Sequence, residues 1–452
     1  MRFEKGVYYY EELLKFLEFL IPPYASVIHI GCGSGEIIGY LRASYKAGVD
    51  ANAQIIEKAK ERFHDVEFIV GNIENVQVTK TFDYVLVINA IEYVNDIQRC
   101  FENIKPLCRP DTRIIIIYFN YLWEPVLKFA EKLGLRRKRD LMEHYLSAED
   151  LEGLLSLCDF EPIKRFDRFL LPVHVPMLSY ILNKLVVKIP FMNNLALNYI
   201  IIARLPMARK TAKEVSCSIV IPCRNEKGNI EEIVKRVPRL GKATELLFIE
   251  GHSKDGTFEE CLRVQREYNT LDIKVSVQDG IGKGDAVLKG FRQATGDVLM
   301  ILDADITVPP EDLGKFFETI VSGKGELVMG NRLMYQMESQ AMRHLNLAGN
   351  KFFSAMFTFL LCQRIKDTLC GTKVLWKEDH LKILAGKDYF GDIDPFGDFD
   401  LILGAAKLNM KIVEIPIRYR ERVYGTTQIS RFRHGLLLLR MVIAAFMKLK
   451  WV

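Results

Sequence analysis

The chain has 452 residues, of which 49% are apolar, a length that exceeds one hydrophobic core and a composition ordinary for globular protein. Its 62 basic and 57 acidic residues leave a net charge of +5, which is too small to indicate nucleic acid as a partner. Nine cysteines occur without a Cys-x-x-Cys pair, which favours a reducing compartment over a disulfide framework. We therefore expect a cytoplasmic protein of two domains.

Membrane-targeting signals are weak in this sequence. Residues 1–10 include Glu4 and Lys5 and are followed by no signal-peptide core, and no uninterrupted apolar run reaches the roughly 18 residues that span a bilayer. Apolar stretches of intermediate length are found at Phe169–Met192, Phe352–Cys362 and Leu436–Met447. They are equally compatible with core helices and with helices on a membrane surface. The C-terminal stretch, which contains Arg440, leaves open a peripheral contact with the cytoplasmic membrane face.

Apolar runs alternate with helical segments in both halves, which predicts two α/β domains with largely parallel sheets. In the first half we predict strands at Val27–Ile30, Ala47–Val49, Val66–Val70, Tyr84–Ile88 and Arg113–Tyr118, closed by Tyr199–Arg204. In the second half we predict strands at Cys217–Ile221, Leu246–Ile249, Lys274–Gln278, Val298–Leu302 and Leu327–Met329. The polar, aperiodic residues 207–215 predict a linker between a domain at 1–206 and a domain at 216–452.

A glycine-rich turn follows the first predicted strand. Gly31, Gly33 and Gly35 let the backbone approach a bound nucleoside closely and open a helix. Their spacing differs from the Gly-x-Gly-x-x-Gly of dinucleotide sites. Asp50 ends the second strand, where its carboxylate can accept hydrogen bonds from two ribose hydroxyls. Taken alone, such a turn is more often an ordinary tight turn, but the ordered series of strand ends favours a cofactor site.

Four segments of the first half resemble class I S-adenosylmethionine-dependent methyltransferases, over roughly residues 25–165. These segments are Ile28–Gly35, Gly48–Asp50, Gly71–Asn72 and Ala90–Asp96. The resemblance implies a Rossmann-like fold that binds S-adenosylmethionine through Gly31, Gly33, Gly35, Asp50, Asn72, Ile73 and Asn89. His29 and Asn72 depart from the acidic residues common in the family, and no general base is evident near Tyr93. A domain that only binds cofactor or serves as a scaffold is therefore the alternative to an active methyltransferase.

The second half has polar groups at the ends of its predicted strands. Ser218–Glu226 runs from a strand into a loop with a guanidinium and a carboxylate, which can meet a nucleotide. Gly280–Ala286 is a flexible loop in which Lys283 can balance phosphate charge, although its spacing is not that of a Walker loop. Asp303 and Asp305 follow the apolar run 298–302, and carboxylates there suit Mg²⁺ or Mn²⁺ bound to a diphosphate. An Asp-x-Asp pair alone is more often a solvated turn.

This ordered set resembles the inverting family-2 nucleotide-sugar glycosyltransferases of the GT-A type, particularly the branch of dolichyl-phosphate mannose synthases, over roughly residues 215–435. The similarity extends to Gly330–Arg332, Asp367–Lys373, Gly397–Asp400 and Arg420–Thr427. It implies a nucleotide-sugar site lined by Pro222, Arg224, Glu226, Glu250, Lys283, Asp303, Arg332 and Arg422, with Asp303 and Asp305 holding the metal. Glu250 and Gly251 stand where relatives commonly carry two aspartates.

Asp398 and Asp400 are the candidate catalytic carboxylates, because a carboxylate near the acceptor can take the proton of an attacking hydroxyl. The alternative is that they cap the helix predicted at Leu401–Lys407. We therefore expect a bifunctional enzyme that transfers a sugar from a nucleotide sugar to a lipid-phosphate or glycan acceptor and methylates a related substrate. Two alternatives are a glycosyltransferase with an inactive N-terminal domain and a non-enzymatic membrane-surface scaffold.

Overall fold

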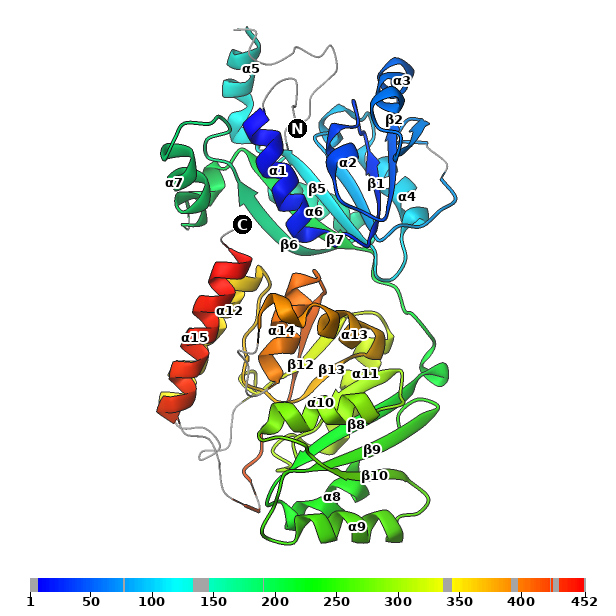
Figure 1. Ribbon diagram of the computed structural model, residues 1–452, viewed down its shortest axis with the longest axis vertical. Helices are drawn as coiled ribbons and strands as arrows, with labels where there is room; N and C mark the ends of the chain where they lie inside the picture. The colour runs from blue at the N-terminus through cyan, green and yellow to red at the C-terminus, as the bar shows by residue number, and fades with distance from the viewer. Residues whose placement is uncertain are drawn as a thin grey trace. The chain divides into compact units, whose positions relative to one another are not determined.

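The computed structural model describes residues 7–75, 78–132, 146–189, 191–335, 344–391, 397–422, 424–425 and 431–450. The chain forms two compact units, residues 1–206 and 207–451 (Figure 1). Residues 207–215, for which we predicted a linker, pack on the second unit, since Arg209 pairs with Asp379 at 2.8 Å. Both units are α/β, as predicted.

The sheet of the first unit has seven strands in the order β3-β2-β1-β4-β5-β7-β6. All adjacent pairs are parallel except those of β7, which runs antiparallel to β5 and β6. The strands are β1 (Ser26–Ile30), β2 (Tyr45–Asp50), β3 (Glu67–Val70), β4 (Tyr84–Ile88), β5 (Arg113–Phe119), β6 (Glu161–Arg168) and β7 (Asn198–Arg204). β6 was not predicted, because its charged sequence lacks the apolar run that marks the central strands.

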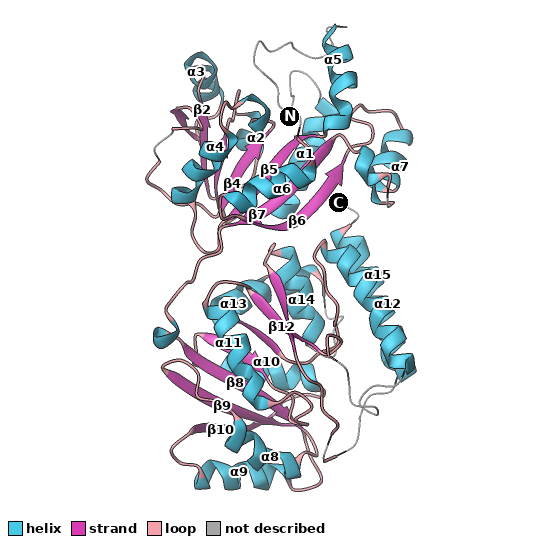
Figure 2. Ribbon diagram, turned by 180° about the vertical axis from the view of Figure 1, so that it is seen from behind, coloured by secondary structure: helices cyan, strands magenta, loops and turns pink. Residues whose placement is uncertain are grey.

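Helices cover both faces of this sheet (Figure 2). Residues of α1, α2 and α3 join one buried cluster, and residues of α4 and α6 join the other. The central strand β5 is buried on both faces, with Ile114–Ile117 fully enclosed, as is usual for parallel strands beneath two helical layers. The helices are α1 (Val7–Leu20), α2 (Glu36–Tyr40), α3 (Ala53–Arg62), α4 (Ile97–Ile104), α5 (Glu124–Lys132), α6 (Ala148–Leu157) and α7 (Leu178–Lys184).

The second unit repeats the arrangement with the strand order β10-β9-β8-β11-β13-β12-β14, in which β13 is antiparallel to both neighbours. The predicted strands of this half form, while β13 and β14 were missed. The strands are β8 (Ser216–Cys223), β9 (Ala243–Glu250), β10 (Asp272–Val277), β11 (Val298–Ile301), β12 (Leu327–Asn331), β13 (Lys373–Trp376) and β14 (Ile412–Pro416).

The helices of the second unit divide between the two faces of its sheet. α8, α9 and α11 contribute to one buried cluster, and α10, α12, α13, α14 and α15 contribute to the other. Their bounds are α8 (Lys227–Arg236), α9 (Thr257–Glu267), α10 (Lys283–Gln293), α11 (Leu313–Val321), α12 (His344–Leu361), α13 (Lys377–Ala385), α14 (Asp398–Lys407) and α15 (Arg431–Leu449).

The two C-terminal apolar stretches lie on α12 and α15, and each helix has a buried and an exposed apolar face. Phe357 and Met441 are enclosed in the core, whereas Phe352 and Ile443 are more than half exposed. The inner faces therefore serve as core, and the outer faces leave the membrane interpretation open. Among the described residues, every helix is too short or too polar to cross a bilayer.

Candidate active sites

The first site begins at the turn between β1 and α2. Gly31, Gly33 and Gly35 all have positive φ, at 73°, 52° and 74°, in the left-handed region that favours glycine. A Cβ added at Gly31 would also lie 2.6 Å from the Cβ of Ala90. The sequence therefore needs glycine here both for the backbone conformation and for close packing against the end of β4.

Asp50, at the end of β2, holds this turn in place. Its Oδ2 accepts a hydrogen bond from the Gly33 N–H at 2.8 Å, and its Oδ1 accepts one from the Asn52 N–H at 2.9 Å. A carboxylate oxygen has more than one lone pair, so both oxygens keep acceptor capacity for ligand hydroxyls. The predicted ribose contact is therefore compatible with the structural role of Asp50.

Asn72 and Ile73 follow β3, next to this turn. The Gly71 N–H bonds the carbonyl of Asp50, which ties the end of β3 to the end of β2. Asn72 Oδ1 accepts the Glu74 N–H at 3.0 Å, and Ile73 packs against the buried cluster beneath α4. Asn72 thus shapes the turn, and its side-chain amide group can still donate.

Asn89, at the end of β4, has a left-handed backbone with φ of 47°. Its Nδ2 donates to the Tyr9 hydroxyl at 3.4 Å, while its buried Oδ1 has no hydrogen-bond partner among the described residues. Strained backbone and an unsatisfied buried oxygen are features that ligand sites tolerate. Tyr9 comes from α1 and was missed by the sequence reasoning, because the helix precedes every recognised motif.

His29 lies inside β1, where family relatives usually carry an acidic residue. Its side chain is buried, and neither ring nitrogen has a hydrogen-bond partner among the described residues. Burial lowers the pKa of His29 to about 4, so the ring is neutral at pH 7. His29 therefore fills the core and offers no charge to a ligand.

The residues of the first site fit a nucleoside cofactor. Gly33 and Asp50 are joined by a hydrogen bond, and Gly31 packs against Ala90, the residue after Asn89. These contacts bring the carboxyl ends of β1, β2 and β4 to one edge of the sheet. The Asn89 Oδ1 supplies an acceptor there that no residue in the described part of the chain uses.

The second site forms around Asp303 and Asp305, which follow β11. Lys283, at the start of α10, lies 2.6 Å from Asp303 Oδ1. Burial alone would raise the pKa of Asp303, but the ammonium of Lys283 holds it below its usual range. The backbone of Gly371 approaches this pair so closely that a Cβ there would lie 2.0 Å from Asp303 Oδ2. The glycine is thus required by the ion pair.

Arg422 bridges two carboxylates of this site. One guanidinium nitrogen lies 2.7 Å from Asp305 Oδ2, and another lies 3.0 Å from Glu226 Oε1. Asp305 also accepts the Thr307 hydroxyl at 2.7 Å. Burial raises the pKa of Glu226 to about 7, although Arg422 partly opposes this shift. The structure therefore joins two predicted nucleotide-sugar residues, Glu226 and Arg422, which lie 196 positions apart in the sequence, with the predicted metal ligand Asp305.

Arg332 has a different environment from Arg422. Its guanidinium makes a bidentate pair with the fully buried Asp367, at 2.7 and 2.8 Å, and lies 5.1 Å from the ring of Tyr419. Such a buried bidentate ion pair fixes the end of β12 against the loop before β13. Arg332, predicted to contact the nucleotide sugar, is directed at Asp367 in this structure.

The remaining predicted nucleotide residues lie at the ends of β8 and β9. The buried carboxylate of Glu250 accepts the backbone N–H of His252 at 3.1 Å and of Ser253 at 2.5 Å, so it stabilises that loop. Pro222 is part of β8, and Arg224 is exposed in the loop that follows. A Cβ at position 251 would lie 3.1 Å from the Cβ of Arg224, so Gly251 gives this side chain room.

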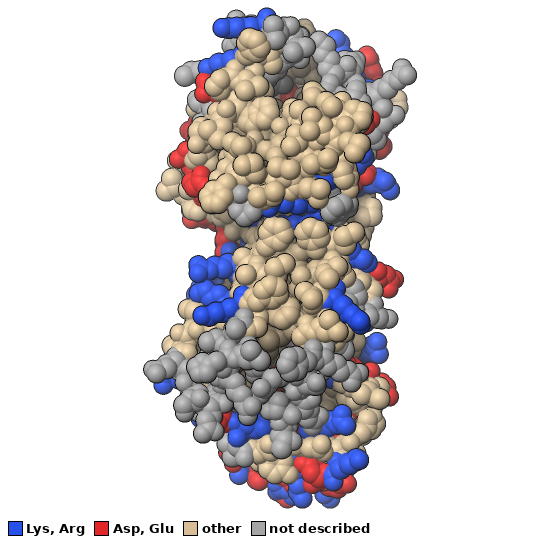
Figure 3. All heavy atoms as spheres, turned by 90° about the vertical axis from the view of Figure 1, so that its left-hand side faces the viewer, with Lys and Arg blue, Asp and Glu red and all other residues tan. Residues whose placement is uncertain are grey.

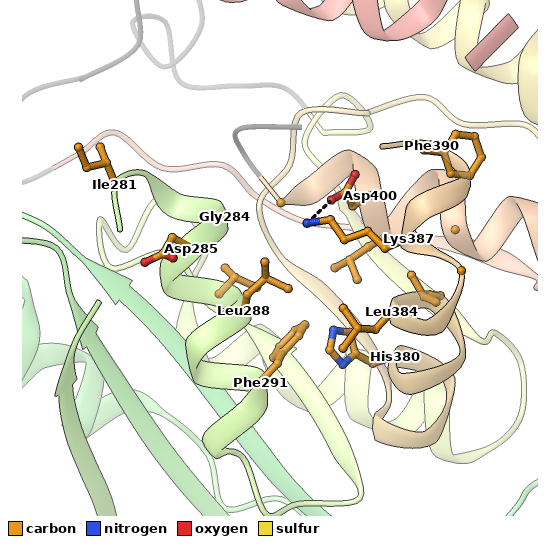
Figure 4. A pocket seen from close by; sticks show the side chains of 16 residues that line it. Ile281, Gly284, Asp285, Leu288, Phe291, His380, Leu384, Lys387, Phe390 and Asp400 are labelled. Atoms are coloured by element: carbon orange, nitrogen blue, oxygen red, sulfur yellow. Dashed lines mark ion pairs between the residues drawn. The ribbon is translucent and has the colours of Figure 1, made fainter. Parts of the chain in front are cut away.

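The candidate catalytic carboxylates lie at the start of α14, whose N-cap is Gly397 with φ of 72°. Asp398 and Asp400 are inside the helix, so the predicted capping role is not observed; the side chain of Asp398 lies outside the described set. Asp400 Oδ2 is 3.9 Å from Lys387 Nζ and lines a cavity of about 210 Å³ (Figure 4). The cavity lies between α10, α13 and α14, and residues such as Leu288, Phe291 and Leu384 make its walls largely apolar.

A divalent cation at Asp303 and Asp305 would need further ligands. Among the described residues, no group of three or more His, Cys, Asp or Glu side chains could hold a metal ion. Hard cations prefer oxygen ligands and accept them from phosphates. The carboxylates therefore fit Mg²⁺ or Mn²⁺ only together with a diphosphate, in exchange for Lys283 and Arg422.

Comparisons with known proteins match the two units separately. Residues 218–382 match the family model for glycosyl transferase family 2, and residues 23–150 match a model for a methyltransferase domain. The chain therefore combines domains of these two transferase families. The prediction that it is an enzyme is confirmed, and so are the resemblances to a methyltransferase and to a family-2 glycosyltransferase.

Two curated relatives are dolichol-phosphate mannosyltransferases. The protein of Pyrococcus furiosus is 27% identical over 47% of this chain and 59% of its own length. The protein of Saccharomyces cerevisiae is 35% identical over 24% of this chain and 41% of its own length. The chain thus spans about half the length of these relatives. Among solved structures, a methyltransferase of Thermotoga maritima dependent on S-adenosylmethionine aligns at 17% identity and a TM-score of 0.35, over 44% of this chain and 90% of that one.

Proposed function

We propose that the chain is a bifunctional enzyme. Its second unit transfers a sugar, with inversion, from a nucleotide-sugar donor to a polyprenyl-phosphate or glycan acceptor, and its first unit methylates a related substrate with S-adenosylmethionine. The observation that carries the transferase assignment is the arrangement of Lys283–Asp303 and Arg422–Asp305 beside Glu226. The names of the relatives, which include an undecaprenyl-phosphate transferase, support a lipid-phosphate acceptor.

The charged residues of the second site have complementary roles in this proposal. A divalent cation held by Asp303 and Asp305 would supply positive charge to the leaving diphosphate. Lys283 and Arg422 donate to phosphate oxygens once they leave the carboxylates. Glu226, whose pKa of about 7 leaves it partly protonated, can donate to as well as accept from the nucleotide.

The acceptor side of the site lies at the start of α14. Asp400 lies 3.9 Å from Lys387 and lines the cavity between α10, α13 and α14, and we retain Asp398 and Asp400 as catalytic candidates. With a hydroxyl acceptor, one carboxylate takes its proton as the anomeric carbon is attacked. With a lipid phosphate, which is already anionic, the same carboxylates position the nucleophile.

In the first unit, Gly31, Gly33 and Gly35 receive the methionine part of the cofactor, and Asp50 binds its ribose. Asn72, Ile73 and Asn89 complete the pocket. The unsatisfied Asn89 Oδ1 supports an occupied pocket, because a bound donor would satisfy it. A scaffold without methyl transfer remains the alternative, since Tyr93 stands where many relatives of the family carry histidine.

A peripheral membrane contact through α12 and α15 is part of the proposal. Leu436, Ile443 and Met447 on α15 are each more than half exposed, and Arg440 and Lys448 lie on the same helix. Apolar side chains accompanied by basic ones suit the surface of an anionic leaflet.

Calorimetry of the full chain with nucleotide sugars plus Mg²⁺ or Mn²⁺, and separately with S-adenosylmethionine, tests both sites. We expect binding of both ligand classes, with donor binding dependent on the metal. If the protein binds the nucleotide-sugar donor but does not bind S-adenosylmethionine, the scaffold alternative is favoured. Binding of neither class would reject the proposal.

A further inference from the structure

The segment between β6 and β7 of the first unit exposes an unusual amount of apolar surface. Eleven large apolar side chains between residues 173 and 195 are more than one third exposed, among them Val173, Met177, Leu178, Ile181, Ile189 and Phe191. We call these eleven side chains the apolar surface. Contiguous exposed apolar area of this kind marks a binding surface on a protein.

The fold anchors this segment from its other side. Asn183 is buried; its Oδ1 accepts the backbone N–H groups of Leu170 and Leu171 at 2.8 and 2.9 Å, and its Nδ2 donates to the Leu171 carbonyl at 2.7 Å. Ser179 is also buried and bonds the backbone of Val175. The apolar side chains are therefore held outward by a polar anchor beneath them.

Charge within residues 169–195 themselves has one sign. Residues 169–195 contain no Asp or Glu, and their only lysines and arginines are Lys184 and Lys188. Figure 3 shows this part of the first unit as a broad tan area, with charged side chains mainly at its edges. Lys184 is half-buried and pairs with Glu12 of α1 at 3.4 Å. A segment whose own charged side chains are lysines complements an anionic lipid leaflet.

The two most exposed members of the apolar surface also have strained backbone. Met177 is 78% exposed with φ of 60°, and Phe191 is 81% exposed with φ of 73°. Left-handed backbone is unfavourable for bulky side chains, and so is their full exposure to water. The cost of exposure is reduced if these side chains insert into lipid.

The segment is connected to the cofactor site through α1. Asn183 Nδ2 donates to the Tyr8 hydroxyl at 3.3 Å, and the ring of Phe169 lies 5.0 Å from that of Tyr9. Tyr9 in turn contacts Asn89 at the end of β4. The segment that carries the apolar surface therefore packs on Tyr8 and Tyr9, and Tyr9 reaches Asn89 of the first site.

We propose that the apolar surface binds the anionic leaflet of a membrane and brings a lipid-borne methyl acceptor to the first site. The acceptor class rests on the proposed function, whereas the lipid contact does not. Methylation would then act on a molecule anchored in a membrane, as the proposed polyprenyl-phosphate sugar acceptor is. This contact is separate from the one proposed for α12 and α15.

Vesicle co-sedimentation of the full chain tests the lipid contact. The vesicles contain phosphatidylcholine with or without one quarter phosphatidylglycerol. Because α15 is expected to bind as well, M177E/F191E is made both in the natural chain and in an I443E/M447E background. The control is L157E, which places one glutamate at a 71% exposed leucine on α6 of the same unit.

We expect M177E/F191E to lower partitioning onto anionic vesicles about tenfold in the I443E/M447E background, where L157E has no effect. Partitioning of M177E/F191E equal to its parent in both backgrounds would overturn the proposal. The proposal would also be overturned if the natural chain bound neutral and anionic vesicles equally. It would be overturned as well if light scattering showed that M177E/F191E only disrupts a dimer of this chain.

Calorimetry on the same proteins separates this inference from the proposed function. M177E/F191E should bind S-adenosylmethionine as the natural chain does, because neither side chain contacts the pocket residues. If no protein binds S-adenosylmethionine while vesicle binding still depends on Met177 and Phe191, the methyltransferase assignment fails and the lipid surface stands.

Discussion

The two sites differ in how they are prepared for their ligands. The proposed methyl-donor site is a turn of three left-handed glycines held by one carboxylate, Asp50, and it carries at Asn89 an acceptor that no described residue satisfies. The glycosyltransferase site is a set of opposed charges, with Lys283 on Asp303 and Arg422 on Asp305. One site is open to its ligand, whereas the other must exchange existing ion pairs for new ones.

The difference follows the charge of the proposed ligands. In the proposed function, a sulfonium cofactor with an amino-acid end is bound by backbone groups, neutral amides and the single carboxylate of Asp50, at little electrostatic cost. A diphosphate with its cation brings charges of both signs, and a site that is already neutral in its absence avoids leaving carboxylates unpaired. The comparison predicts that charge changes affect the second site most and backbone changes affect both.

The largest effect is expected from Asp305→Asn. The variant keeps the shape of Asp305 but removes its charge. It therefore loses the proposed metal contact, and Arg422 keeps an ion pair with Glu226 alone. Turnover of the nucleotide sugar should fall by roughly 10²–10³-fold. Affinity for S-adenosylmethionine, measured by calorimetry, should not change. Unchanged sugar turnover would reject the role of Asp305.

Gly371→Ala tests whether backbone geometry also controls the charged site. Its new Cβ would lie 2.0 Å from Asp303 Oδ2 and 2.3 Å from Lys283 Nζ, so the ion pair must shift. We expect donor turnover to fall roughly tenfold to hundredfold. Gly314→Ala, in α11 with nothing within 4 Å of the new Cβ, is the control and should keep full activity. Equal activity of the two variants would contradict the assignment.

Asp50→Ala tests the glycine-rich turn of the first site. It removes the acceptor for the Gly33 N–H and the proposed ribose contact, at a cost of about 1–3 kcal/mol in cofactor binding. Calorimetry should therefore give roughly 5- to 150-fold weaker binding of S-adenosylmethionine. Glu57→Ala on α3 removes only a surface pair with Lys60 and should bind normally. An Asp50→Ala protein with natural affinity would remove Asp50 from the site.

The smallest effect at neutral pH is expected from His29→Leu, because the buried ring makes no hydrogen bond within the described residues. The pKa of His29 is about 4 in the folded protein and near 6.5 in an unfolded chain. Between these values only the unfolded chain takes up the proton, so the free energy of unfolding decreases as pH falls, by up to about 3 kcal/mol.

His29→Leu should weaken this pH dependence in the first unit. Hydrogen exchange followed by mass spectrometry in dilute urea, at pH 7 and pH 5, resolves the two units. His64→Leu at an exposed position is the control and should leave the dependence unchanged. If both variants lost the same protection between pH 7 and pH 5, groups other than His29 would cause the pH dependence of stability.

The apolar strands and the motifs at their ends were predictable, because buried parallel strands need runs such as Ile114–Ile117 and ligand residues gather at strand ends. β6 and β13 were missed for different physical reasons. β6 carries charged residues at a sheet edge, and β13 has only four residues, among them a buried lysine, Lys373, whose ammonium is satisfied by the Cys370 carbonyl.

For the sites, the sequence indicated which residues take part but not how they pair. Arg422 and Asp305 are separated by 117 positions, and no local pattern states that they are in contact. Arg332 and Arg422 looked equivalent as phosphate ligands, yet one is directed at buried Asp367 and the other at the site carboxylates. Tyr9 carried no signal, because its role depends on how α1 packs.

The contact of Arg422 with Glu226 and Asp305 also bears on synthesis of the protein. Every residue of the methyl-donor site has emerged once the ribosome has passed Pro206, so that unit can fold while the rest is being made. The sugar-donor site, in contrast, lacks its bridging guanidinium until residue 422 is translated. During most of the synthesis of the second unit, Glu226 and Asp305 are without the arginine, and a nascent chain stopped before that residue would carry an incomplete donor site.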